Sequence, residues 1–275
     1  MLDRILLIIG AMKCGTTSLF SYLAQHPQIA PSREKEPDFF TKSPDFLQHL
    51  EEYRALWKWR EGVHRWAMEA STSYTKVPRF PCAAERIATM PGEFRFIYLM
   101  RNPISRIESH LRHLALTGLP QPDAGSPGGI GTSMLAVSRY AMQLDEYERR
   151  FPREHVLLLS FEELQANPRE VLDRVCRFLD IDPAFELKGL GTAFNPSRID
   201  HPVYRALTRI PFLPTAAKLV PVRYRQALRN LISRDPSAVA KLTSEQCAWI
   251  LDQLKDDLKR LHEHYGFDVT SWGLG

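Results

Sequence analysis

Four short apolar runs predict the strands of a buried sheet. They cover residues 4–9, 65–69, 94–100 and 156–159, and most of their positions are aliphatic or aromatic. Runs without regular polar alternation are typical of parallel strands that are covered on both faces. The third run stops at Arg101-Asn102-Pro103, where a proline forces the chain out of the ladder.

The segments between these runs carry helical patterns. Apolar residues at helical spacing predict helices over residues 16–26, 46–59, 82–90, 104–116, 135–150, 168–179 and 243–265. Gly266 is expected to cap the last helix. Residues 31–40 read as a polar loop, and the Gly- and Pro-rich residues 117–132 as a mobile loop or lid.

Alternating strands and helices predict an α/β fold. We expect a three-layer sandwich with a central parallel sheet and a P-loop-like strand-loop-helix unit at its start. The chain is interpreted as a single domain, residues 1–275. It has a core over 1–193, a basic segment over 194–242, and the helix 243–265 packed on that core.

Composition is that of an ordinary soluble globular protein. The chain is 44% hydrophobic and 25% charged, and its net charge of +4 gives a mild preference for anionic ligands but is too low for coating nucleic acid. The four cysteines form no CxxC pair, which predicts neither a zinc site nor a disulfide framework. Because no apolar run is long enough for a signal peptide or a membrane span, we expect a cytoplasmic protein, with peripheral membrane contact left open.

The loop after the first strand carries the most specific chemistry. Residues 10–18 read Gly-Ala-Met-Lys-Cys-Gly-Thr-Thr-Ser, a glycine-bounded turn with one lysine that runs into a helix. Backbone N–H groups and a helix N-terminus bind phosphate in such a turn, and lysine adds a full charge. An ATP-binding loop places its lysine directly after the second glycine. Here that position is Thr16 and the lysine is Lys13, which disfavours an ATPase loop.

A second charged turn follows the strand 94–100. It begins with Arg101, at a place where a magnesium-dependent P-loop enzyme would have an aspartate. Because open α/β sheets bind ligands at the carboxyl ends of their strands, Arg101 and Ser109 form a candidate phosphate clamp. The charge of the nucleotide would then be met by side chains alone.

These two turns, in this order, resemble the sulfotransferases that use 3′-phosphoadenosine 5′-phosphosulfate (PAPS). Residues 10–18 resemble the 5′-phosphosulfate motif of that family, and residues 96–106 with Ser109 resemble its 3′-phosphate motif. The resemblance is nearest to the branch of heparan-sulfate sulfotransferases and their bacterial relatives. It implies direct in-line transfer of a sulfonate, without a metal, to a hydroxyl, or less readily an amine, of a glycan, lipid or small molecule.

The resemblance also assigns roles to single residues. Residues 36–40 read Glu-Pro-Asp-Phe-Phe and resemble the family's E-x-x-F-F segment, which makes Glu36 the base for the acceptor's proton. On the charge pattern alone, Glu36 is as readily one of a run of solvated charges. Lys13 would neutralise the leaving phosphate oxygen. The implied donor contacts are Lys13, Cys14, Gly15, Thr16, Thr17, Ser18, Arg101, Ser109, Ser197 and Arg198.

One position departs from the family pattern. Relatives in this branch often carry a lysine directly after the glutamate that ends the second of the four predicted strands, but here Glu69 is followed by Ala70. A second cation over the sulfonate is therefore missing at that position, which puts the acceptor class in doubt. Ser71, Ser73 or a basic residue elsewhere could compensate.

Two other functions compete with this interpretation. A P-loop small-molecule kinase would bind magnesium and ATP. A non-catalytic polyanion-binding module on the same fold would use the arginine-rich residues 205–229, which also fit an ordinary solvated face. His110 and His113 are expected to pack or to face solvent rather than act as bases. The sequence predicts no oligomeric state.

Overall fold

A sheet of five parallel strands forms the centre of the protein. The computed structural model describes residues 3–42, 44–117, 119, 130–188 and 241–273. The strand order is β2-β3-β1-β4-β5. The strands are β1 (Arg4–Gly10), β2 (Ile29–Pro31), β3 (Trp66–Ala70), β4 (Glu93–Met100) and β5 (Val156–Ser160).

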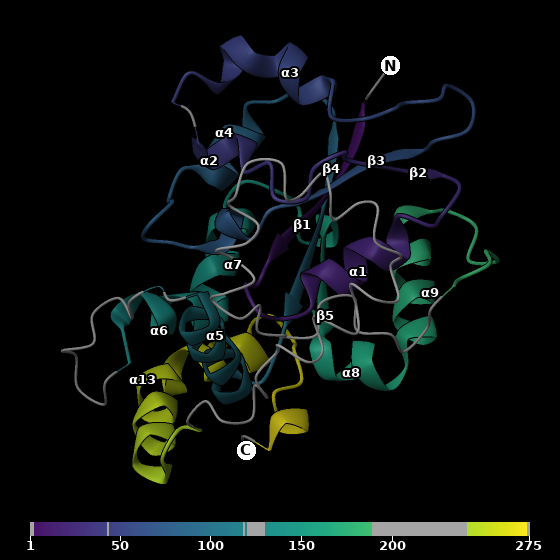
Figure 1. Ribbon diagram of the computed structural model, residues 1–275. Coiled ribbons are helices and arrows are strands. Elements are labelled where there is room, and N and C mark those ends of the chain that lie inside the picture. The colour runs from purple at the N-terminus through teal and green to yellow at the C-terminus, as the bar shows by residue number, and fades with distance from the viewer. Residues whose placement is uncertain (1–2, 43, 118, 120–129, 189–240, 274–275) are drawn as a thin grey trace, which may run out of the picture.

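Helices cover both faces of this sheet (Figure 1), with α1 and α9 on one side and α5, α7 and α13 on the other. The predicted three-layer α/β fold is therefore confirmed. The helices are α1 (Thr16–Leu23), α2 (Phe39–Lys42), α3 (Leu50–Arg54), α4 (Ala83–Ala88), α5 (Pro103–Thr117), α6 (Thr132–Ser138), α7 (Tyr140–Glu148), α8 (Phe161–Ala166), α9 (Pro168–Leu179) and α13 (Ser244–Glu263). No helix within the described ranges is long and apolar enough to cross a bilayer.

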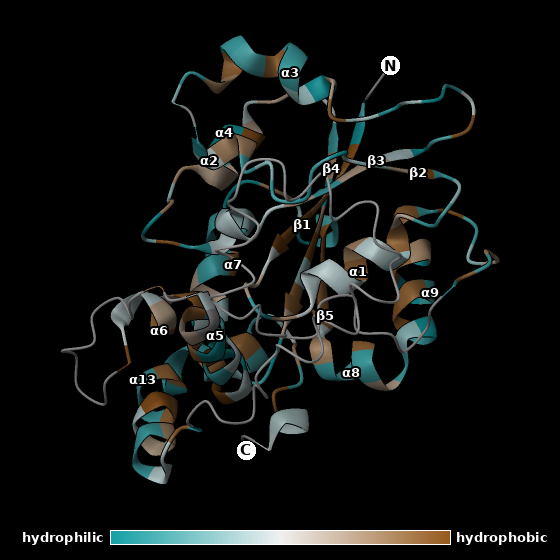
Figure 2. Ribbon diagram, viewed as in Figure 1, coloured by the Kyte–Doolittle hydropathy of each residue, from teal (hydrophilic) through white to brown (hydrophobic). Residues whose placement is uncertain are grey.

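The central strand β1 is the most deeply buried element. Leu6, Leu7, Ile8 and Ile9 are all 0% exposed, and the strand is brown, for hydrophobic, in Figure 2. It pairs with β3 on one side and with β4 on the other. Because both faces and both edges of its middle are covered, this strand is apolar from Ile5 to Ile9.

The prediction of one helix over residues 46–59 is wrong. A short 3₁₀ turn (Phe46–His49) and α3 (Leu50–Arg54) take up its first part, and the helix ends there. The indole N–H of Trp57 donates to the carbonyl of Met68 at 3.0 Å, and Trp57 forms an antiparallel bridge with Ser32. These tertiary contacts hold the chain in an extended form that helical spacing does not reveal.

Other boundaries also differ from the prediction. The predicted helix 135–150 is two helices, α6 and α7, which are separated at Arg139. The predicted loop 31–40 begins at the end of strand β2 and runs into helix α2. Most of the predicted lid, and the basic segment 194–242 up to residue 240, lie outside the described residues. The division of the single domain stays a prediction.

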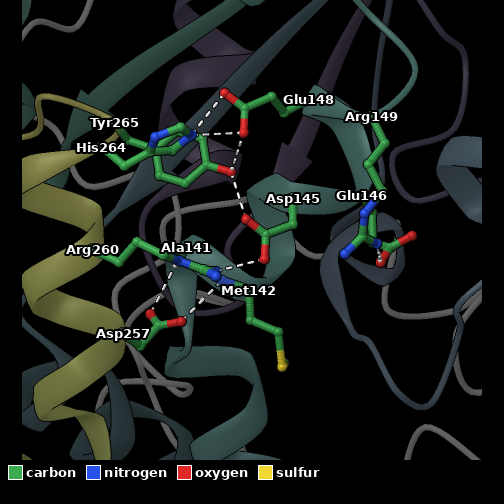
Figure 3. A network of polar contacts seen from close by, with 10 residues as sticks. All are labelled: Ala141, Met142, Asp145, Glu146, Glu148, Arg149, Asp257, Arg260, His264 and Tyr265. Carbon is green, nitrogen blue, oxygen red and sulfur yellow. Dashed lines mark hydrogen bonds and ion pairs between the residues drawn. The ribbon is translucent and has the colours of Figure 1, made fainter.

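Polar contacts attach α13 to the rest of the fold (Figure 3). The carboxylate of Asp257 accepts hydrogen bonds from the N–H groups of Ala141 and Met142, at 3.0 and 2.9 Å, in the first turn of α7. The hydroxyl of Tyr265, just beyond α13, donates to Asp145 at 2.7 Å. Asp257 thus satisfies two N–H groups that a helix start leaves without a partner, as an N-cap residue does.

We expect Asp257→Ala to lower the free energy of unfolding by about 1–2 kcal/mol, the usual effect of losing a helix cap. Chemical denaturation of the purified protein measures this change. The matched control is Asp256→Ala, because Asp256 is exposed on the same helix. An equal loss in both variants would show that Asp257 does not anchor α7.

Candidate active site

A cavity of about 470 Å³ opens where β1, β3 and β4 end, at the carboxyl edge of the sheet. Parallel strands bring the loops that follow them to the same edge, so residues far apart in sequence meet there. Of the predicted site residues, those that line the cavity are Lys13, Gly15, Thr16, Thr17, Ser18, Glu36, Arg101 and Ser109. A larger cavity of about 670 Å³ lies along β5 and has none of them in its lining.

Two glycines allow the loop after β1 to lie close to its neighbours. Gly10 has φ +150°, and a Cβ there would come within 2.1 Å of the Thr75 hydroxyl. Gly15 has φ +87°, and a Cβ there would be 2.6 Å from the ring of Phe161. The N–H of Ala11 donates to the carbonyl of Leu99 in β4 at 2.7 Å, which ties the loop to the sheet. The loop is therefore a fixed turn rather than a flexible linker.

Cys14 is placed differently from the other residues of the loop. Its side chain is fully buried, 3.9 Å from the hydroxyl of Tyr140, and burial raises the pKa of the thiol to about 12. Its N–H donates to the carbonyl of Ala11 at 3.2 Å. Cys14 is the one predicted donor contact within the described residues that does not line the cavity. Its side chain packs in the core.

The turn after β4 holds Arg101 at the cavity. The carbonyl of Arg101 accepts a hydrogen bond from Tyr140 at 2.7 Å, and the side-chain oxygen of Asn102 caps α5 by accepting from Ile104 at 2.9 Å. The guanidinium of Arg101 lies over the ring of Phe161, 4.5 Å from its centre. Its Nε is buried, with no hydrogen-bond partner among the described residues. The backbone is fixed, while the charged group is left able to bind an anion.

Arg112 and Lys76 also line the cavity but were not predicted. Arg112 follows Ser109 by three residues in α5, so both lie on one face of the helix, a signal that was available in the sequence. The Nε of Arg112 is buried without a hydrogen-bond partner in the described part of the chain. Lys76 lies beyond β3, and no motif marks it.

The basic side chains of the cavity influence one another. The pKa of Lys13 is lowered, chiefly by burial and then by the charge of Arg101, while the carboxylate of Glu36 acts in the opposite direction. The pKa of Lys76 is also lowered by burial, and Glu36 again opposes the shift. Four cations, from Lys13, Lys76, Arg101 and Arg112, thus share the cavity with one acidic side chain. Its net charge favours anionic ligands.

His113 lines the cavity as well, and the expectation that it does not act as a base stays a prediction. His110 does not line it. Burial and the charge of Arg106 lower the pKa of His110 to about 3, so the ring is neutral near pH 7. Among the described residues, no group of three or more His, Cys, Asp or Glu side chains is arranged to hold a metal ion.

Glu36 lies on a turn that the end of β3 holds in place. The N–H of Glu36 donates to the carbonyl of Ala70 at 2.8 Å, and the N–H of Asp38 donates to the hydroxyl of Ser71 at 3.0 Å. Both Glu36 and Asp38 have left-handed φ values, of 60° and 55°. Lys35 pairs with the Glu36 carboxylate at 2.7 Å. The side chain of Glu36 is 42% exposed, so an acceptor can reach it.

The buried acid Glu69 is connected to this turn by hydrogen bonds. Glu69, the residue before Ala70, is 0% exposed and accepts hydrogen bonds from the hydroxyls of Ser71 (2.7 Å), Tyr74 (2.7 Å) and Tyr53 (3.1 Å). Burial raises the pKa of Glu69 to about 7, although the three hydroxyls oppose the shift. The Ser71 hydroxyl donates to Glu69 and accepts from the N–H of Asp38, so it links the buried acid to the turn.

The family model described as "Sulfotransferase family" matches residues 6–186. The chain belongs to the sulfotransferase family. It is 32% identical over 183 residues to human heparan sulfate glucosamine 3-O-sulfotransferase 6, covering 64% of this chain and 52% of that protein. A bifunctional heparan sulfate N-deacetylase/N-sulfotransferase 1 from Caenorhabditis briggsae is 26% identical over 218 residues. That match covers 71% of this chain and 24% of the relative.

A solved structure shares the fold. The crystal structure of a sulfotransferase from Alicyclobacillus acidocaldarius aligns with a TM-score of 0.68 at 21% identity, covering 99% of this chain and 100% of that one. The match to the human 3-O-sulfotransferase spans only about half of that protein, 52% of its length. The predicted family is therefore confirmed, and the predicted site residues stay predictions.

The raised pKa of Glu69 predicts a pH-dependent stability. Because the folded-state pKa, about 7, lies above the ordinary value of 4.5, the ionised acid opposes folding. Relative to Glu69→Gln, the wild-type protein should lose stability as pH rises from about 4.5 to about 7, and the difference should then level off. Denaturation curves of both proteins across this range measure it. A constant difference at every pH would contradict the shift.

Proposed function

We propose that this chain transfers a sulfonate group from PAPS to a hydroxyl of an acceptor. The observation that carries the proposal is the lining of the cavity, where four basic side chains and the start of α1 surround a space shared with Glu36. An anionic donor matches these cations, and the carboxylate offers a base for the acceptor's proton. Membership of the sulfotransferase family supports the same reaction.

The described residues fit such a donor. Arg101 and Arg112 each have a buried Nε without a hydrogen-bond partner in the described ranges, so both guanidiniums are able to take up an anion. With Ser109 between them in the sequence, they would hold the 3′-phosphate. The N–H groups at the start of α1, together with Lys13, would hold the 5′-phosphosulfate. Ser197 and Arg198, proposed as further contacts from the resemblance, lie outside the described residues.

The reaction breaks the bond between sulfur and the 5′-phosphate oxygen, which keeps the electron pair, and forms a bond between that sulfur and the acceptor oxygen. Glu36 would take the proton that the acceptor oxygen loses. Lys13 would stabilise the charge that develops on the leaving phosphate oxygen. The charge of Glu36 raises the pKa of Lys13 against the effect of burial, and both side chains line the same cavity, so base and leaving-group cation face one ligand space.

A glycan hydroxyl is the acceptor that the relatives favour, because the human relative is named as a heparan sulfate glucosamine 3-O-sulfotransferase. Lipid and small-molecule hydroxyls are the other acceptors predicted from the sequence. Incubation with PAPS and candidate acceptors, followed by mass spectrometry for the gain of one sulfonate, separates the three classes. The cytoplasmic location stays a prediction.

The competing functions make different binding predictions. A P-loop kinase would bind ATP in a magnesium-dependent way, yet Thr16 stands where its lysine belongs and Arg101 stands at the end of β4. A polyanion-binding module would bind heparin without dependence on a nucleotide. The segment proposed for it, residues 205–229, lies outside the described residues.

Binding of the product nucleotide, adenosine 3′,5′-bisphosphate, tests the donor. We expect tight binding by calorimetry without added metal, and a loss of about tenfold to a hundredfold in Arg101→Ala, because a charged hydrogen bond to phosphate is removed. Arg177→Ala, an exposed position in α9, is the control and should bind as the wild type does. If the wild-type protein fails to bind the bisphosphate, the proposed function is wrong.

Replacement of the base separates binding from turnover. We expect Glu36→Gln to bind the bisphosphate with wild-type affinity while its turnover falls by about a hundredfold or more, the contribution typical of a positioned base. Glu34→Gln serves as the matched control, because Glu34 is exposed and does not line the cavity. An unchanged rate in Glu36→Gln would remove Glu36 from its role.

A further inference from the structure

Lys76 lines the same cavity as Lys13 and Glu36, although the position after Glu69 carries no lysine. Ala70, at the family position, is 0% exposed, and its carbonyl is bonded to the N–H of Glu36. Six residues later the chain has left β3 through a 3₁₀ turn (Thr72–Thr75) and returns Lys76 to the cavity lining, together with Lys13 and Glu36. The strand end itself carries no cation, but the turn that follows it brings one to the cavity.

The backbone on both sides of Lys76 is held by buried groups. The hydroxyl of Thr75 donates to the carbonyl of Ile9, directly before the phosphate-binding loop, at 2.7 Å. The side-chain amide of Gln143, which is 1% exposed, accepts from the N–H of Val77 at 2.9 Å and donates to its carbonyl at 3.0 Å. Lys76 is thus fixed relative to the loop that carries Lys13. Such fixed placement is what electrostatic catalysis requires.

The charge of Lys76 interacts with acidic side chains at the cavity. The carboxylates of Glu36 and Asp38 are the groups that raise its pKa, against the lowering by burial and by Arg79 and Arg106. Within the described residues its ammonium forms no ion pair. Lys13, in contrast, is influenced by Arg101 and Arg112 on the donor side as well as by Glu36. Glu36 is the carboxylate that raises the pKa of both lysines, and all three side chains line the same cavity.

We propose that Lys76 binds the sulfonate that is being transferred, as a second cation in addition to Lys13. This inference rests on the proposed function. In it, Lys13 neutralises the leaving phosphate oxygen, while Lys76 neutralises the non-bridging oxygens of the sulfonate as sulfur passes to the acceptor. The acceptor's proton still goes to Glu36, and the bisphosphate leaves with its electron pair.

The discriminating experiment compares two nucleotides that differ only in the sulfonate. Dissociation constants for PAPS and for adenosine 3′,5′-bisphosphate are measured by calorimetry without acceptor. The proteins compared are the wild type, Lys76→Met, which keeps the length of the side chain but removes its charge, and Lys76→Arg, which keeps the charge. Lys58→Met, at an exposed position outside the cavity lining, is the control for loss of one positive charge.

We expect Lys76→Met to bind PAPS about tenfold more weakly while its affinity for the bisphosphate stays within about twofold of the wild type. Its turnover should fall by about a hundredfold, as when a donor to a developing oxyanion is removed. Lys76→Arg should recover most of the affinity for PAPS, and Lys58→Met should match the wild type.

Two outcomes would overturn the inference. Equal weakening of both nucleotides would place Lys76 on the bisphosphate rather than on the sulfonate, and unchanged binding of both with unchanged turnover would give it no role. Either result requires a wild-type protein that binds the bisphosphate. Failure of the wild type itself to bind is a failure of the proposed function and is thereby distinguished from a failure of this inference.

Discussion

The pairing of β1 between β3 and β4 is the constraint on which the candidate site depends. Because the three strands are parallel and in contact, they end together, and the segments that leave them open on the same cavity. Lys13 comes from the first of these segments, Lys76 from the second and Arg101 from the third. None of the three is close to the others in sequence. A shift in the pairing of either neighbour would separate the charges from the loop that Gly10 and Gly15 shape.

The sequence was most informative where local pattern and tertiary environment agree. The fully buried run Leu6–Ile9 can only be a central strand, and the turn that follows has a recognisable spacing. Strand β2 and helix α2 were missed because they are short and depend on contacts with distant residues. One such contact is the hydrogen bond from the N–H of Asp38 to Ser71. The extended chain at Trp57 depends on the carbonyl of Met68. Such contacts between distant residues leave no periodic trace in the sequence.

The candidate site likewise contains residues that the sequence could predict and residues that it could not. Residues 10–18, Glu36, Arg101 and Ser109 belong to motifs, so their positions could be predicted. Lys76 could not, because its approach to the cavity depends on the turn after β3 and on the buried amide of Gln143. The burial of the Cys14 side chain could not be predicted from the motif either, because the motif specifies the course of the loop and not the direction of each side chain.

The contacts of Trp272 connect the end of the described chain to the turn after β4. Its carbonyl accepts from the Asn102 side chain at 3.0 Å across a sequence separation of 170 residues, and its indole donates to Glu162 at 3.0 Å. Glu162 in turn accepts from the N–H of Asn102 at 3.1 Å. The family model stops at residue 186. All residues that line the cavity lie within that match, but Trp272, which is hydrogen-bonded to Asn102 and Glu162, does not. An excised recombinant fragment bounded by the match would therefore keep the cavity lining and lose the contacts that Trp272 makes with the residue after Arg101.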